Sequence, residues 1–433
     1  MLLEFSIGNF LSFKDKKTLS LEATAITDFL ETNVISLDNI KLLKSAVIYG
    51  ANSSGKTNLL RGFSTMRQII ISSAKQSSMD GLPVTPFLLN SESTSKPSSF
   101  EVLFFTDGKR FRYGFELTQK AVVTEWLFEV LRTKERLLFI RENDKIQVED
   151  AFTEGVNLEQ KTRNNALFLA ICDQFNGKIS GLIMKWFENV RTISGLEHED
   201  YRGFTFSMLK SDKTKHSLMK FFSKLDLGFD KVVVSKNDFN PAFLPKGLPE
   251  DILKQMISDL QGKTIVNAET LHKKMNNDGS VAEWLHFDLR TQESSGTNKV
   301  FDLSGHVFNT LSMGGVLIID ELDAKLHPLL TNAIVKLFNS KEYNPCNAQL
   351  IFATHDTNLL SMGNFRRDQI YFVEKDHYEV SDIYSLAEYK EKDGLKVRKD
   401  RSFEKDYIQG RYGAIPFIGN FDNLFKHGTK SKN

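Results

Sequence analysis

Eight consecutive residues near the N-terminus have the composition of a phosphate-binding loop. Residues 50–57, GANSSGKT, fit the pattern G-x-x-x-x-G-K-[ST] in full. Glycines let the backbone curl so that successive N–H groups face a phosphate chain. The stretch follows an apolar run, SAVIYG, that predicts a buried strand, and it opens a helical pattern that continues to about Ser73. Because the motif requires this context, a phosphate-binding loop is favoured over a mere glycine-rich turn.

The residue types in this loop predict a phosphate chain and Mg²⁺ as ligands. Lys56 is expected to bind the β- and γ-phosphates, and the hydroxyl of Thr57 is expected to ligate Mg²⁺. The helix that follows directs its positive N-terminal end at the same place. The predicted nucleotide-binding residues of the loop are Gly50, Asn52, Ser53, Ser54, Gly55, Lys56, Thr57 and Asn58.

A second stretch, GGVLIIDE at residues 314–321, is an apolar run that ends in two carboxylates. A strand that is buried on both faces has such a continuous run, and α/β sheets bind ligands at the carboxyl ends of their strands. Asp320 is expected to hold Mg²⁺, directly or through water, and Glu321 is expected to polarise the attacking water as a general base. A solvated acidic turn is the alternative, and the phosphate-binding loop in the same chain disfavours it.

A third apolar run, QLIFAT at residues 349–354, ends before His355. A histidine at a strand end is often an ordinary loop residue. This one follows the strand that comes after the paired carboxylates, and its position favours a catalytic role in which His355 senses a γ-phosphate.

The segments that must position these residues change character along the chain. Residues 74–99 predict a loop because they are rich in Ser and Pro, and residues 100–148 alternate like an antiparallel meander. Helical periodicity dominates residues 157–262, which predicts an inserted helical subdomain. Strand patterns return in KTIVNAETLHKK and VAEWLHFDL, joined by the hairpin turn NNDG, before a helix that is expected to end near Met313.

The composition excludes several classes of protein. Lys and Arg number 56 and Asp and Glu number 55, so the overall charge does not by itself indicate nucleic-acid or membrane binding. Cys172 and Cys346 form no CxxC pair and the stretch HED at 198–200 lacks metal-ligand spacing, so we expect no zinc site and place HED on the surface. The absence of a basic N-terminal region and of an 18-residue apolar run predicts a cytoplasmic protein without a signal peptide or a membrane span.

The order of these motifs resembles that of ABC-type ATPases. In that group a Ser-Gly element just before a helix lies between the P-loop and the paired Walker B carboxylates, and ESSGT at residues 293–297 has this position. ESSGT is closer to the signature of SMC-like and OLD-like ATPases than to the LSGGQ of transporters, and IGNFLSF and ELDAKLHP are similar to their N-terminal strand and D-loop. The resemblance implies an α/β protein: an ABC-ATPase P-loop fold with a mixed sheet, an antiparallel β meander and the inserted helical subdomain.

On this basis we expect four parts in the chain. ATPase lobe I, with the P-loop and the β meander, is expected at residues 1–156, and the helical subdomain at 157–262. ATPase lobe II, with the signature, the Walker B carboxylates and the histidine switch, is expected at 263–390, and a C-terminal extension at 391–433.

The resemblance also implies that each ATP site needs two copies of the chain. In such ATPases two protomers face head to tail, and the signature Ser and Gly of one protomer bind the γ-phosphate held by the P-loop of the other. Carried over, Ser295 and Gly296 are the contacts to the partner's nucleotide, with Ser294 as a near alternative. The implied assembly is a head-to-tail dimer or a higher even oligomer, which ATP joins and hydrolysis releases.

With GRYGAIPFIG at residues 410–419, the motifs more narrowly resemble the ATPase subunits of bacterial anti-phage, or abortive-infection, operons. That resemblance implies a sensor or switch subunit that controls a separate effector protein, which we expect to be a nuclease. OLD-type nucleases carry a Toprim domain after the ATPase. The segment after His355 is too short for it, so we expect no nuclease in this chain.

Two other functions are compatible with the ATPase motifs. One is an SMC-like DNA-binding repair clamp, in which local basic clusters would bind nucleic acid. Charge runs are more often solvated surfaces, so nucleic acid stays an open partner. The other is the nucleotide-binding subunit of a membrane transporter, which the ESSGT signature and the large insertion disfavour. The basic clusters are Arg132, Lys134 and Arg136, and Lys210, Lys213 and Lys215.

Overall fold

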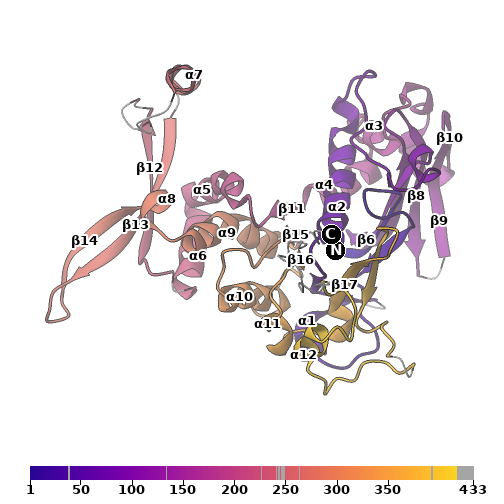
Figure 1. Ribbon diagram of the computed structural model, residues 1–433. Helices are drawn as coiled ribbons and strands as arrows, with labels where there is room; N and C mark the ends of the chain where they lie inside the picture. Colours follow the sequence, from indigo (N-terminus) through magenta and orange to yellow (C-terminus); the bar gives the residue numbers. More distant parts are fainter. Residues whose placement is uncertain are drawn as a thin grey trace, which may run out of the picture.

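A mixed six-stranded sheet forms the centre of the molecule (Figure 1). All neighbouring strands are parallel except the last pair, which is antiparallel. The computed structural model describes residues 1–37, 40–132, 134–225, 227–239, 241, 244, 249–262, 264–391 and 394–416. In spatial order the central strands are β11 (Val190–Ser194), β15 (Val316–Asp320), β16 (Gln349–Ala353), β5 (Ser45–Tyr49), β17 (Ile370–Lys375) and β18 (Ser381–Ser385).

The inner strands of this sheet are buried on both faces, as their continuous apolar runs predict. Along β5, Ala46 and Ile48 belong to one hydrophobic core, whereas Val47 and Tyr49 belong to a second core on the opposite face. One core therefore lies on each side of the sheet. The helices that pack against the sheet are α2 (Lys56–Ser72) in the first core, and α9 (Ser295–Met313) and α10 (Pro328–Asn339) in the second.

A seven-stranded sheet, antiparallel throughout, covers the first core and confirms the meander predicted at residues 100–148. The two N-terminal strands extend the meander, and α2 is packed between the two sheets. In spatial order the strands are β10 (Lys145–Val148), β9 (Lys134–Glu142), β8 (Val122–Leu131), β7 (Lys109–Leu117), β6 (Ser98–Thr106), β1 (Leu2–Gly8) and β2 (Lys17–Ser20).

The segment at residues 157–262 is rich in helices, as predicted, but it is not helical throughout. It contributes β11 to the central sheet, where Val190 pairs in parallel with Val316. This strand is only five residues long and depends on a distant partner, so a search for helical periodicity does not find it. The helices of the segment are α3 (Phe168–Gln174), α4 (Lys178–Glu188), α5 (Arg202–Lys210), α6 (Asp212–Lys224) and α7 (Glu250–Leu260).

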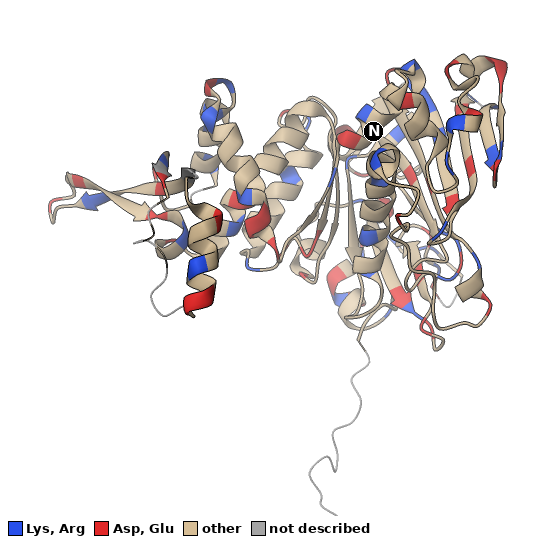
Figure 2. Ribbon diagram, turned by 90° about the horizontal axis from the view of Figure 1, so that it is seen from above, with Lys and Arg blue, Asp and Glu red and all other residues tan. Residues whose placement is uncertain are grey.

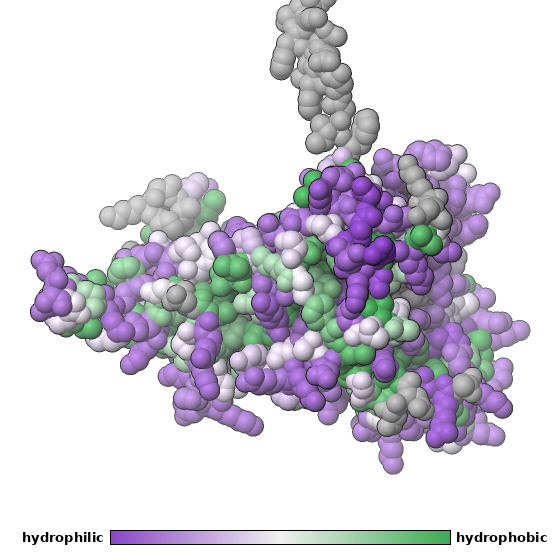
Figure 3. All heavy atoms as spheres, turned by 90° about the horizontal axis from the view of Figure 1, so that it is seen from below, coloured by the Kyte–Doolittle hydropathy of each residue, from purple (hydrophilic) through white to green (hydrophobic). Residues whose placement is uncertain are grey.

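A three-stranded antiparallel sheet forms an arm that projects away from the seven-stranded sheet (Figure 1). The predicted hairpin turn is confirmed, because the N–H of Asn276 donates to the carbonyl of Ser280 at 2.8 Å. The tip of the arm is hydrophilic, whereas apolar residues are visible along the middle of the molecule (Figure 3). The arm consists of β12 (Lys231–Asp238), β13 (Thr264–Met275) and β14 (Val281–Asp288), and the short helix α8 (Leu289–Gln292) joins it to α9.

Shorter elements pack around these sheets, and the two-stranded pair among them buries Ile35 and Leu42 against Leu3 of the seven-stranded sheet. They are α1 (Leu30–Asn33), β3 (Val34–Leu37), β4 (Ile40–Leu43), α11 (Asn358–Ser361) and α12 (Phe403–Ile408). The tail KHGTKSKN, predicted to be disordered, lies outside the described residues. Among the described helices, none combines the length and the apolar character that crossing a membrane requires.

Gly305 lies where α9 crosses α5 without room for a side chain. A Cβ atom at this position would be 2.6 Å from Oγ1 and 2.8 Å from Cα of Thr205. We expect Gly305→Ala to lower the free energy of unfolding by about 1–3 kcal/mol, because the two helices must separate. Gly203, on α5, has nothing within 4 Å of the corresponding atom. Gly203→Ala is therefore expected to change the free energy of unfolding by less than about 1 kcal/mol in denaturant unfolding. If both variants lose the same free energy of unfolding, the close crossing of the two helices is contradicted.

His306, the next residue of α9, is predicted to make the fold sensitive to acid. Its ring stacks on Phe204 with centroids 4.4 Å apart. Burial, and to a smaller extent Arg191, lowers the pKa of His306 to about 4 from 6.5. Between these values the unfolded chain binds the proton more tightly, so the stability contributed by neutral His306 is lost as the pH falls through this window. We expect His306→Phe, which keeps a stacked ring, to lose less stability than the wild type between pH 6.5 and 4 in urea unfolding. Equal losses of stability in the variant and the wild type over this pH range would contradict the assignment to His306.

Candidate nucleotide-binding site

The predicted P-loop connects β5 to α2 and has the tight curvature that the motif requires. Ser53 and Gly55 have positive φ angles of 64° and 117°. A Cβ atom at Gly50 would lie 2.3 Å from the carbonyl oxygen of Val373, and one at Gly55 would lie 2.3 Å from Oγ of Ser381. Only glycine fits these two positions, because neighbouring chain segments occupy the space of a side chain.

Lys56 points into the loop from the first turn of α2. Its ammonium donates to the carbonyl oxygens of Gly50 at 2.9 Å and Ala51 at 3.0 Å. Burial lowers the pKa of Lys56, and the carboxylates of Asp320 and Glu321 oppose that shift. Both Walker B carboxylates are thus close enough to act electrostatically on the P-loop lysine. Among the other loop residues, Asn52, Ser53 and Thr57 are exposed and Asn58 is half-buried.

Two buried polar atoms of the site have no hydrogen-bond partner among the described residues: Oγ of Ser54 and Oδ1 of Asp320. Buried polar atoms are almost always paired, and leaving one unpaired costs about 1–3 kcal/mol. A phosphate oxygen at Ser54 and a metal ion or its water at Asp320 would complete their bonding. The residues present therefore fit a nucleotide and Mg²⁺.

His355 lies across from the loop, after β16. Its backbone N–H is 3.3 Å from both carboxylate oxygens of Asp323, and its side chain is exposed. His355 and Asn52 line one pocket of about 360 Å³, together with Tyr49, Gly50, Ala51, Thr357, Tyr407, Ile408, Ile415 and Pro416. The fold thus brings the predicted histidine beside the predicted P-loop.

The signature residues Ser295 and Gly296 occupy the first turn of α9. Ser294 is the N-cap, and its hydroxyl accepts from the N–H of Thr297 at 3.0 Å. This role in capping leaves Ser295 and Gly296 as the first residues of the helix. In the part of the chain that is described, no hydrogen bond joins either residue to the P-loop. Instead, a Cβ atom at Gly296 would lie 3.0 Å from the carbonyl oxygen of Lys325.

Lys299, which the sequence analysis did not single out, ties the signature helix to the D-loop. Its buried ammonium donates to the carbonyl oxygens of Glu321, Leu322 and Ala324 at 3.1, 3.0 and 2.6 Å. Burial lowers the pKa of Lys299 to about 8 from 10.5. The buried part of α9 also contains Asn298 and Asp302, so a lysine among these residues gives no local signal of this contact in the sequence.

The C-terminal segment packs beside the P-loop. The ring centroids of Tyr407 and Tyr49 lie 5.6 Å apart. Burial raises the pKa of Tyr407 to about 12, and the backbone of Gly50 opposes this shift. The hydroxyl of Tyr407 donates to the carbonyl of Ala414 at 3.1 Å. The motif GRYGAIPFIG therefore contributes its described part to a wall of the site, and residues 417–419 of it lie outside the described residues.

The segment NFLSF supports the P-loop from behind through Ser12. The hydroxyl of Ser12 accepts from Nδ2 of Asn58 at 2.9 Å and lies 2.7 Å from Oγ of Ser381, which is also 2.7 Å from the carbonyl of Ser54. Leu11 beside it is half-buried with a φ of 50°. These contacts join three distant segments of the chain to one face of the loop.

One sequence expectation about this region is wrong. His198 was expected on the surface, but it is 2% exposed and its ring bonds to Asp302 at 2.8 Å. The reason is that β11 enters the central sheet, so the residues after it are carried against α9.

The predicted basic clusters do not form a uniform basic face. Arg136 forms an ion pair with Glu129, whose other oxygen pairs with Lys109. Basic and acidic residues are interspersed on the ribbon (Figure 2). The second cluster, Lys210, Lys213 and Lys215, is on the exposed surface of α5 and α6. Within the described residues, no group of three or more His, Cys, Asp or Glu side chains is arranged to hold a metal ion.

The loop after β5, the carboxylates at the end of β15 and the histidine after β16 define a P-loop nucleotide-binding protein of α/β fold. The sequence model of the family described as "AAA domain, putative AbiEii toxin, Type IV TA system" matches residues 45–190 and 256–361. This match covers more than half of the chain, and the chain belongs to this AAA-domain family. The family confirms the predicted resemblance to abortive-infection ATPases.

Two solved structures are similar to the chain at low sequence identity. The SMC head domain from Thermotoga maritima is 13% identical, with 89% of this chain and 98% of that chain covered and a TM-score of 0.42. A structure of the recombination mediator protein RecF in the RecFOR pathway is 12% identical, with 89% of this chain and 98% of that chain covered and a TM-score of 0.33. No curated protein matches the sequence at a significant level.

Gly55→Ala is predicted to damage nucleotide binding more than it damages the fold. The added methyl would meet Ser381 in a backbone conformation that disfavours side chains, so we expect nucleotide affinity to fall about tenfold or more. Gly108 is a matched control, since its φ of 74° is also positive but nothing lies within 4 Å of a Cβ atom there. Gly108→Ala is expected to bind a fluorescent ATP analogue like the wild type. A similar affinity in the two variants would contradict the requirement for glycine at position 55.

Proposed function

We propose that the chain binds and hydrolyses ATP as a head-to-tail dimer. In this role it is the sensor or switch subunit of a bacterial anti-phage defence complex whose effector, a nuclease, is a separate protein. The observation that carries the proposal is that the chain holds two halves of a site that do not meet within it. The P-loop half has unpartnered buried atoms at Ser54 and Asp320, and the signature half, Ser295 and Gly296, is fixed to the D-loop instead.

The P-loop half contains the residues that would hold ATP and Mg²⁺. Lys56 and the exposed loop donors would bind the phosphates, and Thr57 and Asp320 would hold the metal ion. When bound, Mg²⁺ neutralises charge on the β- and γ-phosphates. Glu321 would accept a proton from the attacking water, and its charge acts on Lys56. His355, which lines one pocket with Asn52, would sense the γ-phosphate.

The signature half supplies N–H donors at the start of α9. The first N–H groups of a helix lack partners within the helix and attract anions. With Ser294 engaged in capping, Ser295 is exposed and Gly296 follows it without a side chain. A second protomer could bring its nucleotide to this turn, and Ser295 would add a hydroxyl donor to the N–H groups.

The role in defence rests on the family and on the chain's architecture. The family's description names a type IV toxin–antitoxin system, which supports an output exerted together with other proteins. The arm runs through α8 into the signature helix, so a protein or other trigger bound to the arm could change the position of the signature. A nucleotide-dependent dimer controlled in this way is suited to switch an effector.

Glu321→Gln is predicted to trap the ATP-bound dimer. Removing the general base should slow hydrolysis by about 10²- to 10⁴-fold and leave ATP binding intact. Native mass spectrometry of this variant, expressed with its neighbouring genes, should show even-numbered assemblies that carry ATP and a second polypeptide. The Lys56→Ala, Glu321→Gln double variant is the control and should remain monomeric with ATP added.

A Glu321→Gln chain that binds ATP and stays monomeric would refute the head-to-tail dimer. Even-numbered assemblies without a second polypeptide would retain the ATPase dimer and refute the separate effector. Assembly only in the presence of duplex DNA, weakening steeply with salt, would replace the defence switch by the DNA clamp.

A further inference from the structure

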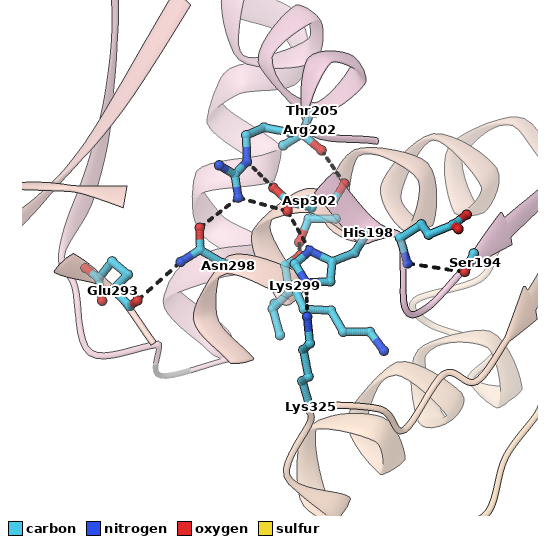
Figure 4. Close-up of polar contacts among 12 residues, drawn as sticks. Ser194, His198, Arg202, Thr205, Glu293, Asn298, Lys299, Asp302 and Lys325 are labelled. Carbon is cyan, nitrogen blue, oxygen red and sulfur yellow. Dashed lines mark hydrogen bonds and ion pairs between the residues drawn. The ribbon is translucent and has the colours of Figure 1, made fainter. Parts of the chain in front are cut away.

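A buried polar network lies behind the signature turn, between α9, α5 and the short helix His198–Tyr201 (Figure 4). The carboxylate of Asp302 on α9 is fully buried and accepts from two residues. Arg202 donates to it through Nε at 2.6 Å and through Nη2 at 3.0 Å, and Nδ1 of His198 lies 2.8 Å from Oδ2. One carboxylate therefore organises a guanidinium and an imidazole.

The first branch of the network ends on the signature turn. Arg202 also donates through Nη2 to Oδ1 of Asn298 at 2.8 Å. The amide nitrogen of Asn298 donates to the carbonyl oxygens of Ser294 at 3.1 Å and Glu293 at 3.3 Å. Asp302 is thus connected through two side chains to the residues that begin α9.

The second branch ends on the D-loop. Nε2 of His198 lies 3.4 Å from the ammonium of Lys325 (Figure 4). An ammonium group can only donate, so Nε2 accepts and Nδ1 carries the proton that is donated to Asp302. Lys325 has a positive φ of 62°, which is uncommon for a residue other than glycine. The contact with His198 is therefore one of the interactions that hold the D-loop in an uncommon backbone conformation.

Stability alone does not explain such a network. Replacing a buried ion pair with well-packed apolar residues often leaves stability unchanged or increased, so a buried pair is weak evidence for a role in holding the fold. A polar network does fix geometry, because each hydrogen bond sets a distance and a direction. Here one end of the network is the signature turn, which the proposed dimer presents to the partner's nucleotide, and the other end is the D-loop, which begins at Glu321.

We propose that Asp302, with Arg202 and His198, is a coupling unit that makes the signature turn and the D-loop move as one body. His198 acts as a positioning residue through Lys325, and Arg202 acts as one through Asn298. Lys299 and the close approach of Gly296 to the carbonyl of Lys325 join the same two elements at further points. This inference rests on the proposed head-to-tail dimer and names what aligns its trans half-site.

Lys325→Met in the Glu321→Gln background tests the coupling, because Lys325 is exposed and its loss should not prevent folding. We expect ATP binding to each chain to stay within about twofold and ATP-dependent dimerisation to weaken about tenfold. His198→Ala removes this contact together with the bond to Asp302, so it should cause at least the same loss. The double variant should be no worse than His198→Ala alone, since the contact between the two residues is already absent. Lys325→Arg, which keeps a cationic donor, should restore most of the dimerisation. The control is Lys336→Met, an exposed lysine of α10, which should change nothing.

If the losses of dimerisation add up in the double variant, or if Lys325→Met dimerises fully, the proposed coupling is overturned. Should the Glu321→Gln parent itself fail to dimerise, the proposed function fails and hydrogen exchange of the chain alone decides the inference. Lys325→Met should then speed exchange at residues 295–299 as well as at the D-loop, because the two are one body. Faster exchange confined to the D-loop would overturn the proposal.

Discussion

The candidate site depends on three parallel strands that are buried on both faces. β5, β15 and β16 lie next to one another, and their carboxyl ends face one edge of the sheet. Since parallel strands cannot be joined by tight turns, each is followed by a long excursion of the chain before the next returns. The P-loop ends 263 residues before Asp320, and His355 follows Glu321 by 34 residues, so the pairing of these strands is what brings the three together.

Polar contacts at the two ends of these strands differ in a way that marks the functional edge. At the amino ends, the side chain of Gln349 accepts from the N–H of Leu2 and donates to the carbonyl oxygens of Leu2 and Leu43. These bonds join the central sheet to the seven-stranded sheet and satisfy the buried amide. At the carboxyl ends, Ser54 and Asp320 have buried atoms that are unpaired. Because buried groups normally find partners, the edge with incomplete bonding is the one built for a ligand.

The parts of the site that the sequence predicts are those with a local pattern. The P-loop, the β15 carboxylates and the β16 histidine each follow a continuous apolar run, and the structure places each at a strand end as expected. The network around Asp302 has no such pattern, since its members come from three segments and their pairing depends on how α5 packs on α9. The same reason explains why the stretch HED was placed on the surface although His198 is buried. The packing of Tyr407 on Tyr49 is likewise a contact between distant segments.

The arrangement of these parts explains how a single chain could report a binding event. The signature turn does not rest on the P-loop of its own chain but on the D-loop, to which Lys299 and Gly296 join it. Its helix begins directly after the arm, through α8. In the proposed dimer, a change at the arm would therefore reach the signature turn without first passing through the nucleotide held by the same chain. Coupling between two sites requires that both act on one element with alternative positions, and α9 with its D-loop is the element in this fold that both the arm and a partner's nucleotide would contact.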